Sequence, residues 1–396
     1  MMQISPETQL FIREHSSDDV RVLALQAKKY PDIDMPTVIT QIAGRKVAAE
    51  KIPSWWEIEK IWYPKHLSLE QCSSEITARY KARLLQGDSL TDLTGGFGID
   101  CSFLATGFKS ATYVERQEEL CEIAAHNFPV LNLNHINIKN EDGVTYLQAM
   151  SPVDCLFLDP ARRNEHGGKT VAISDCEPNV AELEELLLQK ANRVMIKLSP
   201  MLDLSLALKE LKQTQEVHIL SVNNECKELL ILLGQTSPTE ISIHCVNLST
   251  KGTQEEQHFV FTREQEQCSE CTYTDSLETY LYEPNASLLK AGAFRSIAAA
   301  YPVRKLHPNS HLYTSDTFIE NFSGRIFRIV NQCSFNKKEV KENLADLKKA
   351  NVTVRNFPAT VAELRKRIHL AEGGDTYLFA STLNNGQKVL IRCEKV

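Results

Sequence analysis

The 396-residue sequence lacks an apolar run of the roughly 18 residues that a membrane-spanning helix requires. Its first residues, MMQISPETQLFIREHSSDD, have neither the basic start nor the apolar core of a secretion signal. The 11 cysteines are odd in number and scattered. That usage argues against a disulfide framework and favours a reducing compartment. We therefore expect a cytoplasmic protein that does not contact membranes.

The sequence also offers little for a metal ion. The one close cysteine pair is Cys268 and Cys271. A zinc site built on them needs a second pair, or histidines at ligand spacing, and neither follows. Two unlinked thiols are the simpler interpretation, and we expect no metal.

Charge is distributed unevenly. Residues 320–396 hold 14 Lys and Arg against 8 Asp and Glu, a net of +6, which leaves −13 for the rest of a chain whose total is −7. A basic C-terminal segment on an acidic body indicates either a polyanionic partner or only a solvated helical surface.

Residues 1–80 read as a small helical domain, with apolar residues at helical spacing over 20–30 and 37–49. Residues 69–85 contain a further helix that Ser73 or Ser74 can cap. Trp55, Trp56 and Trp62 lie within eight positions of one another. Such a cluster either packs the helices onto a neighbouring domain or stacks nucleic-acid bases, and packing is the favoured interpretation.

Residues 81–238 alternate between strands and helices. The strands are expected at 90–94, 111–115, 136–140, 153–158, 193–198, 217–222 and 228–233. This alternation predicts an α/β domain with a seven-stranded, mostly parallel Rossmann-like sheet. The last two strands are joined by only about five residues, too few for a parallel crossover, so the final strand should run antiparallel to its partner.

Three shorter segments complete the expected organisation. Residues 239–275 contain two alternating runs around a polar turn, which predict a hairpin insertion. Residues 276–319 form a small segment, and residues 320–396 read as a βαβαββ module of α+β type. Its closing hairpin turns at Asn384-Asn385-Gly386.

The glycine-rich stretch at residues 88–100, DSLTDLTGGFGID, is the segment around which we expect the rest of the chain to be organised. A buried strand ends in a turn containing Gly95, Gly96 and Gly98, and a helix follows. Glycine allows positive φ and close approach of a ligand to the backbone. A turn of this kind before a helix is typical of a nucleotide pocket at the carboxyl end of a strand.

Acidic residues follow four neighbouring strands: Asp92, Glu115, Asp142 and Asp159. Glu115 lies 23 residues after Asp92, a spacing at which a carboxylate can accept hydrogen bonds from both ribose hydroxyls. Asp142 is placed to accept from an adenine amine. Cys101 stands where an NAD fingerprint has its third glycine, and no P-loop lysine follows. S-adenosylmethionine (SAM) is therefore favoured over NAD.

In this order and spacing, DLTGGFGID, YVER, EDG and FLDPARR resemble the motifs of class I SAM-dependent methyltransferases. The chain beyond about residue 60 is similar to bacterial methyltransferases with a C-terminal THUMP-like domain. The more specific matches are LEQCSSEITARYKA and RNFPATVAELRKR…EGGDTYLFAST, and 280–316 looks like the family's small ferredoxin-like segment. THUMP domains bind RNA in enzymes that modify tRNA and rRNA, so the resemblance implies an RNA partner.

The resemblance also implies roles for individual residues. The implied cofactor-binding residues are Asp92, Thr94, Gly96, Phe97, Gly98, Glu115, Asp142 and Asp159. The implied catalytic residues are Asp159, Pro160 and Arg162, at the position of the D-P-P-aromatic motif of amino methyltransferases. Ala161 and Arg162 replace that motif's last two residues, so the acceptor atom stays open. Arg162, Arg163 and Lys197, which ends the fifth strand, are the expected substrate-binding residues.

A variant D-P-P-R motif occurs in uracil-C5 methyltransferases, which need a nucleophilic cysteine. Cys226 lacks that family's motif context, and we expect it to be structural. Three functions stay open: methylation of a tRNA or rRNA base, which the motifs favour; methylation of a small molecule or a protein; and a SAM-sensing or RNA-binding module without catalysis.

Overall fold

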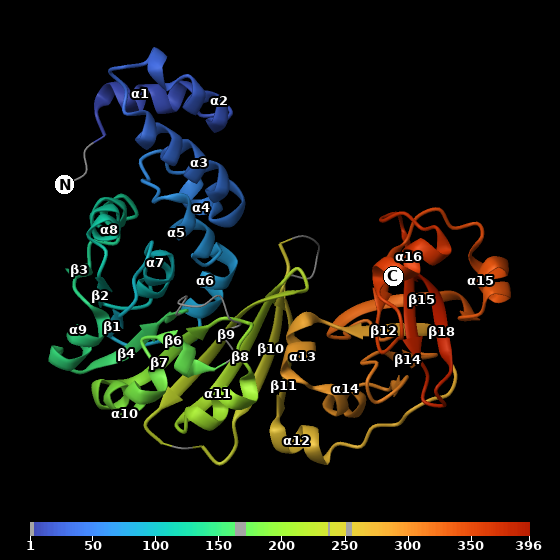
Figure 1. The fold of residues 1–396 in the computed structure, drawn as a ribbon. Helices are drawn as coiled ribbons and strands as arrows, with labels where there is room; N and C mark the ends of the chain where they lie inside the picture. The colour runs from blue at the N-terminus through green and yellow to red at the C-terminus, as the bar shows by residue number, and fades with distance from the viewer. Residues whose placement is uncertain (1–3, 163–171, 237, 251–255) are drawn as a thin grey trace. The chain divides into compact units, whose positions relative to one another are not determined.

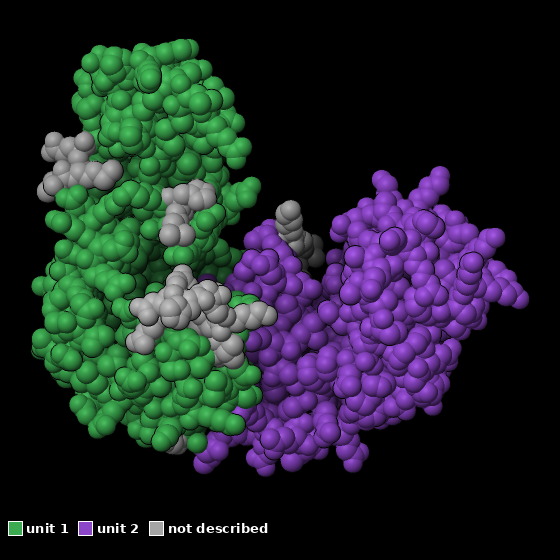
Figure 2. Space-filling view, in the orientation of Figure 1, with its two compact units in different colours: residues 1–215, 229–238 green, residues 216–228, 239–396 purple. Residues whose placement is uncertain are grey.

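The computed structural model describes residues 4–162, 172–236, 238–250 and 256–396, and Figure 1 shows the order of their helices and strands. Two compact units, coloured separately in Figure 2, comprise residues 1–215 with 229–238 and residues 216–228 with 239–396. Among the described residues, no helix has the length and apolarity needed to cross a membrane.

The first unit begins with six helices. They are α1 (Pro6–Glu14), α2 (Val20–Leu25), α3 (Met35–Lys51), α4 (Pro53–Trp56), α5 (His66–Gln71) and α6 (Glu75–Ala82). Side chains of Ser5, Asp19 and Asp34 accept from first-turn amides and so fix where the first three begin. The helix expected within 69–85, with Ser73 or Ser74 as its cap, is confirmed as α6, whose N-cap residue is Ser74. The backbone is extended at Cys72 and Ser74, which separates α5 from α6.

The tryptophans mainly pack within this unit. Trp55 is buried and meets the Phe97 ring edge to face, with the ring centroids 5.2 Å apart. Trp62 stacks on His126 at 3.7 Å. These contacts join the N-terminal helices to the glycine-rich stretch and to helix α8 (Glu118–Val130), in agreement with the packing interpretation.

A large mixed sheet follows. Its strands are β1 (Ser89–Asp92), β2 (Ser110–Glu115), β3 (Ile136–Asn140), β4 (Val153–Leu158), β7 (Ala191–Leu198), β8 (Thr214–Val222), β9 (Glu225–Gly234), β10 (Ser242–Leu248) and β11 (Glu256–Thr262). Their spatial order is β11-β10-β8-β9-β7-β4-β1-β2-β3. The connecting helices are α7 (Ile99–Ala105), α8 (Glu118–Val130), α9 (Gly143–Ala149), α10 (Val180–Lys190) and α11 (Leu204–Glu210).

The expected α/β class is confirmed, and so is the antiparallel strand: β9 runs antiparallel to β7, whereas β7, β4, β1, β2 and β3 are parallel. The expected count of seven strands is wrong, because nine strands form this sheet within the part of the chain that the structure describes. The predicted hairpin at 239–275 forms as β10 and β11, but β10 pairs with β8 and extends the sheet. Buried residues on both faces of β10, Cys245 and Val246 among them, explain why this hairpin does not stand alone.

The second unit contains a seven-stranded sheet of order β13-β14-β12-β15-β18-β17-β16. Its strands are β12 (Tyr280–Pro284), β13 (Arg304–Lys305), β14 (Tyr313–Ser315), β15 (Gly324–Ser334), β16 (Asn351–Val354), β17 (Thr376–Thr382) and β18 (Lys388–Lys395). Its helices are α12 (Arg263–Cys268), α13 (Ala286–Ala291), α14 (Phe294–Ala300), α15 (Lys337–Leu344) and α16 (Val361–Ile368). The βαβαββ order expected from residue 320 onward is present, and β12 pairs with β15 within the same sheet.

Candidate active site

The glycine turn lies between β1 and α7. The Gly95 amide donates to the Val114 carbonyl at 2.8 Å, and a Cβ on Gly95 would lie 2.2 Å from the Tyr113 ring, so this glycine is needed for packing. Gly96 and Gly98 have positive φ of 54° and 85°. A Cβ on Gly96 would meet nothing closer than 3.8 Å, so its outer side is open to a ligand.

Glu115 holds this turn from the end of β2. Its Oε2 accepts from the Gly96 amide at 2.9 Å, and its Oε1 accepts from the Gln117 amide at 2.8 Å. A carboxylate has about four acceptor positions, so these two bonds leave capacity for a ligand's hydroxyl groups. The predicted ribose-binding acid therefore lies directly beside the open face of Gly96.

Asp92 lies at the end of β1 and is 1% exposed. Its Oδ1 accepts from the Thr94 amide at 3.0 Å, whereas its Oδ2 is buried and has no hydrogen-bond partner among the described residues. Burial raises the pKa of Asp92 to about 8, although the Thr94 bond opposes this shift. A buried oxygen of this kind is an unmet binding requirement in the ligand-free chain.

Thr94 and Phe97 have structural contacts that the sequence did not indicate. The Thr94 hydroxyl accepts from the Asp159 amide at 2.6 Å and so ties the turn after β1 to the loop after β4. The Phe97 side chain is buried against Trp55. Only the Phe97 backbone is therefore placed to reach a cofactor.

Asp142 lies after β3, as expected, and is exposed. Its Oδ1 caps α9 by accepting from the Val144 and Thr145 amides at 3.1 and 2.9 Å. The next residue, Gly143, lies so close to the β1 turn that a Cβ on it would be 2.2 Å from the Leu93 carbonyl oxygen. The loops after β1 and β3 therefore touch, and this contact is possible only with glycine at position 143.

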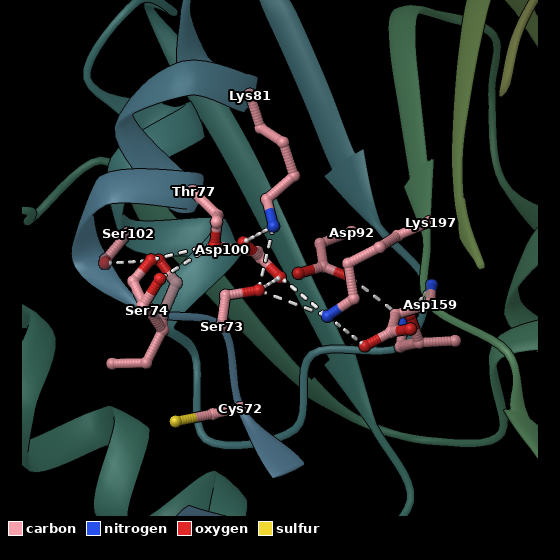
Figure 3. A network of polar contacts seen from close by, with 12 residues as sticks. Cys72, Ser73, Ser74, Thr77, Lys81, Asp92, Asp100, Ser102, Asp159 and Lys197 are labelled. Carbon is pink, nitrogen blue, oxygen red and sulfur yellow. Dashed lines mark hydrogen bonds and ion pairs between the residues drawn. The ribbon is translucent and has the colours of Figure 1, made fainter. Parts of the chain in front are cut away.

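A buried polar network lies beside Asp92 (Figure 3). The Lys81 ammonium, 0% exposed, donates to the Ser73 hydroxyl at 2.8 Å and lies 2.9 Å from Asp100 Oδ1. Ser73 donates to Asp100 Oδ2 at 2.7 Å. The Lys197 ammonium lies 3.2 Å from Asp100 Oδ2 and 2.5 Å from Asp159 Oδ2.

The two ammonium groups set the charge state of this network. Burial alone would raise the pKa of Asp100, but Lys81 and Lys197 outweigh it and hold that pKa well below its usual range. Burial raises the pKa of Asp159, and the Lys197 ammonium opposes the shift. Lys197, which we predicted to bind substrate, forms an ion pair with Asp159 in this network.

The remaining predicted residues follow Asp159. Pro160 is buried. Arg162 ends the two-residue strand β5 (Ala161–Arg162), which pairs with β6 (Cys176–Glu177). Arg163 lies outside the described residues.

Sequence reasoning missed Ser73, Lys81 and Asp100 as members of a site. Ser73 and Lys81 lie in LEQCSSEITARYKA and Asp100 in DLTGGFGID, stretches that had been singled out for other reasons. The usable signal was a lysine on the buried face of a helix. Lys81 lies one turn after Thr77 in α6, on the face that also buries Ala78.

Two family models match the C-terminal region: a ferredoxin-like domain over residues 280–322 and a THUMP domain-like family over residues 324–395. A comparison with curated proteins gives no significant match. Among solved structures, a crystal structure of a "putative methyltransferase" from Porphyromonas gingivalis W83 is 34% identical over 100% of both chains, with a TM-score of 0.87.

Weaker similarities involve the sheet region. An rRNA methylase from Streptococcus thermophilus is 15% identical over 40% of this chain and 93% of its own, with a TM-score of 0.30. The Streptococcus mutans protein SMU.1697c, solved in complex with SAH, is 14% identical over 40% of this chain and 96% of its own, also at 0.30. These two carry no argument about this chain. The full-length match, together with the two domain models, is decisive: the chain belongs to the class I methyltransferase family that carries ferredoxin-like and THUMP-like domains at its C-terminal end.

Proposed function

We propose that this protein transfers a methyl group from SAM to a base of tRNA or rRNA. One observation carries the cofactor assignment. The Glu115 carboxylate bonds the Gly96 amide beside the open side of that glycine, and the unpartnered Oδ2 of Asp92 is buried at the end of the adjacent strand. These features fit an adenosyl group with a polar tail.

In this proposal, Glu115 binds the ribose hydroxyls, Asp142 accepts from the adenine amine, and Asp92 with Gly96 and Gly98 surrounds the methionine portion. SAM, when bound, supplies an electrophilic methyl group on a sulfonium. The chain's own task is then to hold a nucleophile about 3–3.5 Å away and in line, and positioning alone can supply much of the acceleration.

Asp159 is the residue proposed to orient or deprotonate a substrate N–H. Its side chain is 37% exposed, and the ion pair with Lys197 uses Oδ2. That pair fixes the position of the carboxylate, and the Lys197 ammonium opposes the rise in its pKa, which suits an acceptor of N–H hydrogen bonds. Lys197 is accordingly a positioning residue. Arg162 and Arg163 are proposed to bind a phosphate or stack on a base.

The RNA assignment rests on the THUMP-like match over 324–395 and on the net charge of +6 over 320–396. A small-molecule or protein acceptor is the second candidate. The acidic remainder of the chain and the missing aromatic after Asp159-Pro160 favour it. A SAM-binding module without catalysis is the third.

The test is transfer of radiolabelled methyl from SAM to total RNA from a strain lacking this protein. We expect incorporation into that RNA and little into wild-type RNA, where the sites are already methylated. Mass spectrometry of the nucleosides then identifies the base. Asp159→Asn should abolish incorporation while calorimetry still detects SAM binding, and Asp32→Asn, at an exposed position, should behave as wild type.

Equal incorporation into both RNAs, or none, would count against the RNA proposal. SAM binding with no turnover on RNA, extracted protein or extracted small molecules would favour the third candidate. No SAM binding at all would refute the cofactor assignment.

A further inference from the structure

Four ligand-type side chains gather in the second unit, and nothing in the methyl-transfer proposal uses them. We call Glu216, His218, His244 and His258 the histidine cluster. They belong to three neighbouring strands, β8, β10 and β11. His218 and His244 are direct partners in the β8–β10 register, and Glu216 lies two residues from His218 on the same face.

The fourth member joins them diagonally. His244 faces Val260 across β10 and β11, and His258, two residues away, therefore shares its face. Because the side-chain period of a strand is two, all four side chains project from one face of the sheet. Three adjacent strands thus contribute three imidazoles and one carboxylate to a single place.

The distances suit a shared ion. His218 Nε2 lies 3.2 Å from Glu216 Oε2, and His244 Nδ1 lies 3.1 Å from His258 Nε2. One ligand atom each from Glu216, His218 and His244 lies within 4.8 Å of the others. Two ligands on a tetrahedral zinc ion, with bonds of about 2.0–2.1 Å, are roughly 3.3 Å apart. The donor pairs in the cluster are already close to that separation.

The cluster is also partly shielded from solvent. His218 is 3% exposed, and its ring stacks on that of His244 with centroids 4.3 Å apart. Burial, together with His218 and His258, lowers the pKa of His244 to about 4, so this ring is uncharged at neutral pH. The two ring planes are only 15° from parallel, so binding one ion through both requires a rotation about one Cβ–Cγ bond, a soft torsion in histidine.

We propose that the histidine cluster is a transition-metal site for Zn²⁺, held by Glu216, His218 and His244, with His258, which contacts His244, as the fourth ligand. The ion replaces the hydrogen bonds that now join the donors in pairs. It links β8 and β10 to the edge strand β11 and so stabilises that end of the sheet. This differs from our expectation of no metal, which considered only ligands spaced closely in the sequence.

The experiment is calorimetric titration of ZnCl₂ into the full chain, purified without a histidine tag and treated with chelator. We expect about one equivalent to bind, and the thermal midpoint to rise when zinc is added. His218→Gln and His244→Gln should each weaken binding at least about ten-fold. If either variant fails to fold, His258→Gln at the exposed edge gives the same comparison.

Two controls separate this site from the other possible zinc ligands. The double variant Cys268→Ser/Cys271→Ser and the exposed-site variant His369→Asn should both bind as wild type, and asparagine tolerates the positive φ of position 369. Cobalt bound in place of zinc should show a tetrahedral visible spectrum without thiolate charge-transfer bands. Binding that survives all three histidine variants, that disappears in the cysteine variant, or that is absent in the wild type would overturn the proposal.

Discussion

Replacing Asp92 by asparagine should stabilise the first unit, and increasingly so as the pH rises. The side chain is buried, its Oδ2 has no partner among the described residues, and its pKa is raised to about 8. In the unfolded chain the same group ionises near 3.8. Its contribution to stability is therefore intact below pH 4 and declines as the pH rises toward 8. Asparagine cannot ionise, and its oxygen can still accept from the Thr94 amide.

The size of the effect follows from that difference in pKa. Each pKa unit corresponds to about 1.36 kcal/mol, and integration from pH 5 to pH 8 gives a loss of roughly 3–4 kcal/mol for the wild type. This is an upper bound, because water penetration raises the effective dielectric constant around buried groups. All other titratable groups are the same in both proteins. Their effect therefore cancels when the free energy of unfolding of the wild type is subtracted from that of the variant.

The assay is urea unfolding followed by tryptophan fluorescence at pH 5, 6, 7 and 8. All three tryptophans, Trp55, Trp56 and Trp62, lie in the first unit together with Asp92, so the signal reports that unit alone. We expect the advantage of the variant to grow steadily with pH, whereas Asp32→Asn should give no such trend. An advantage that changes by less than about 1 kcal/mol over this range would refute the assignment of Asp92 as a protonated, buried acid.

Four further outcomes are expected. SAM affinity should rise between pH 6 and 8 in the wild type but not in Asp92→Asn, because a cationic ligand favours the ionised carboxylate of Asp92. Calorimetry in buffers of different ionisation enthalpy measures the proton that Asp92 releases when SAM binds. Glu115→Gln should weaken SAM binding roughly ten- to a hundred-fold, since a hydrogen bond to a charged acceptor is worth about 1.5–3 kcal/mol, and the exposed Glu118→Gln should have no effect in the same titration. Lys81→Met should destabilise the first unit by roughly 3–5 kcal/mol in the urea assay, because it leaves Asp100 buried with one counter-ion fewer, whereas the exposed Lys60→Met should be neutral. Gly143→Ala should lower the free energy of unfolding by roughly 1–3 kcal/mol, because the added methyl group meets the Leu93 carbonyl oxygen. Gly107→Ala, whose methyl group has no neighbour nearer than 3.7 Å, should be tolerated. Equal melting temperatures for the two variants would contradict the Leu93 contact.

Local patterns predicted the elements well and their assembly less well. The glycine turn, the alternation of strands and helices and the short β8–β9 connection were enough to predict the parallel sheet and its antiparallel strand. The runs in β10 and β11 also predicted a hairpin. Their pairing with β8 depends on apolar surface that must be covered on both faces, and a local pattern does not specify which strand covers it.

The polar network was beyond sequence reasoning for a similar reason. Ser73 and Asp100 are 27 residues apart, and Lys197 is 97 residues from Asp100. Ser73 and Asp100 looked like ordinary residues at the start of a helix, and Lys197 was predicted to bind substrate and not to pair with Asp100. Hydrophobic periodicity marks which faces are buried, but it does not tell which buried charges meet.

The network explains why the pKa of Asp92 is raised while that of Asp100 is lowered. Lys81 and Lys197 supply two positive charges, and Asp100 and Asp159 accept both through direct ion pairs. Asp92, a third carboxylate in the same region, forms no ion pair among the described residues. Burial raises its pKa most, and the charges of Asp100 and Asp159 raise it further, whereas the Lys197 ammonium only partly opposes the shift. A positively charged ligand placed next to Asp92 would supply the missing charge. Under the proposed function, a bound sulfonium or ammonium group next to Asp92 would favour the ionised form of this buried carboxyl.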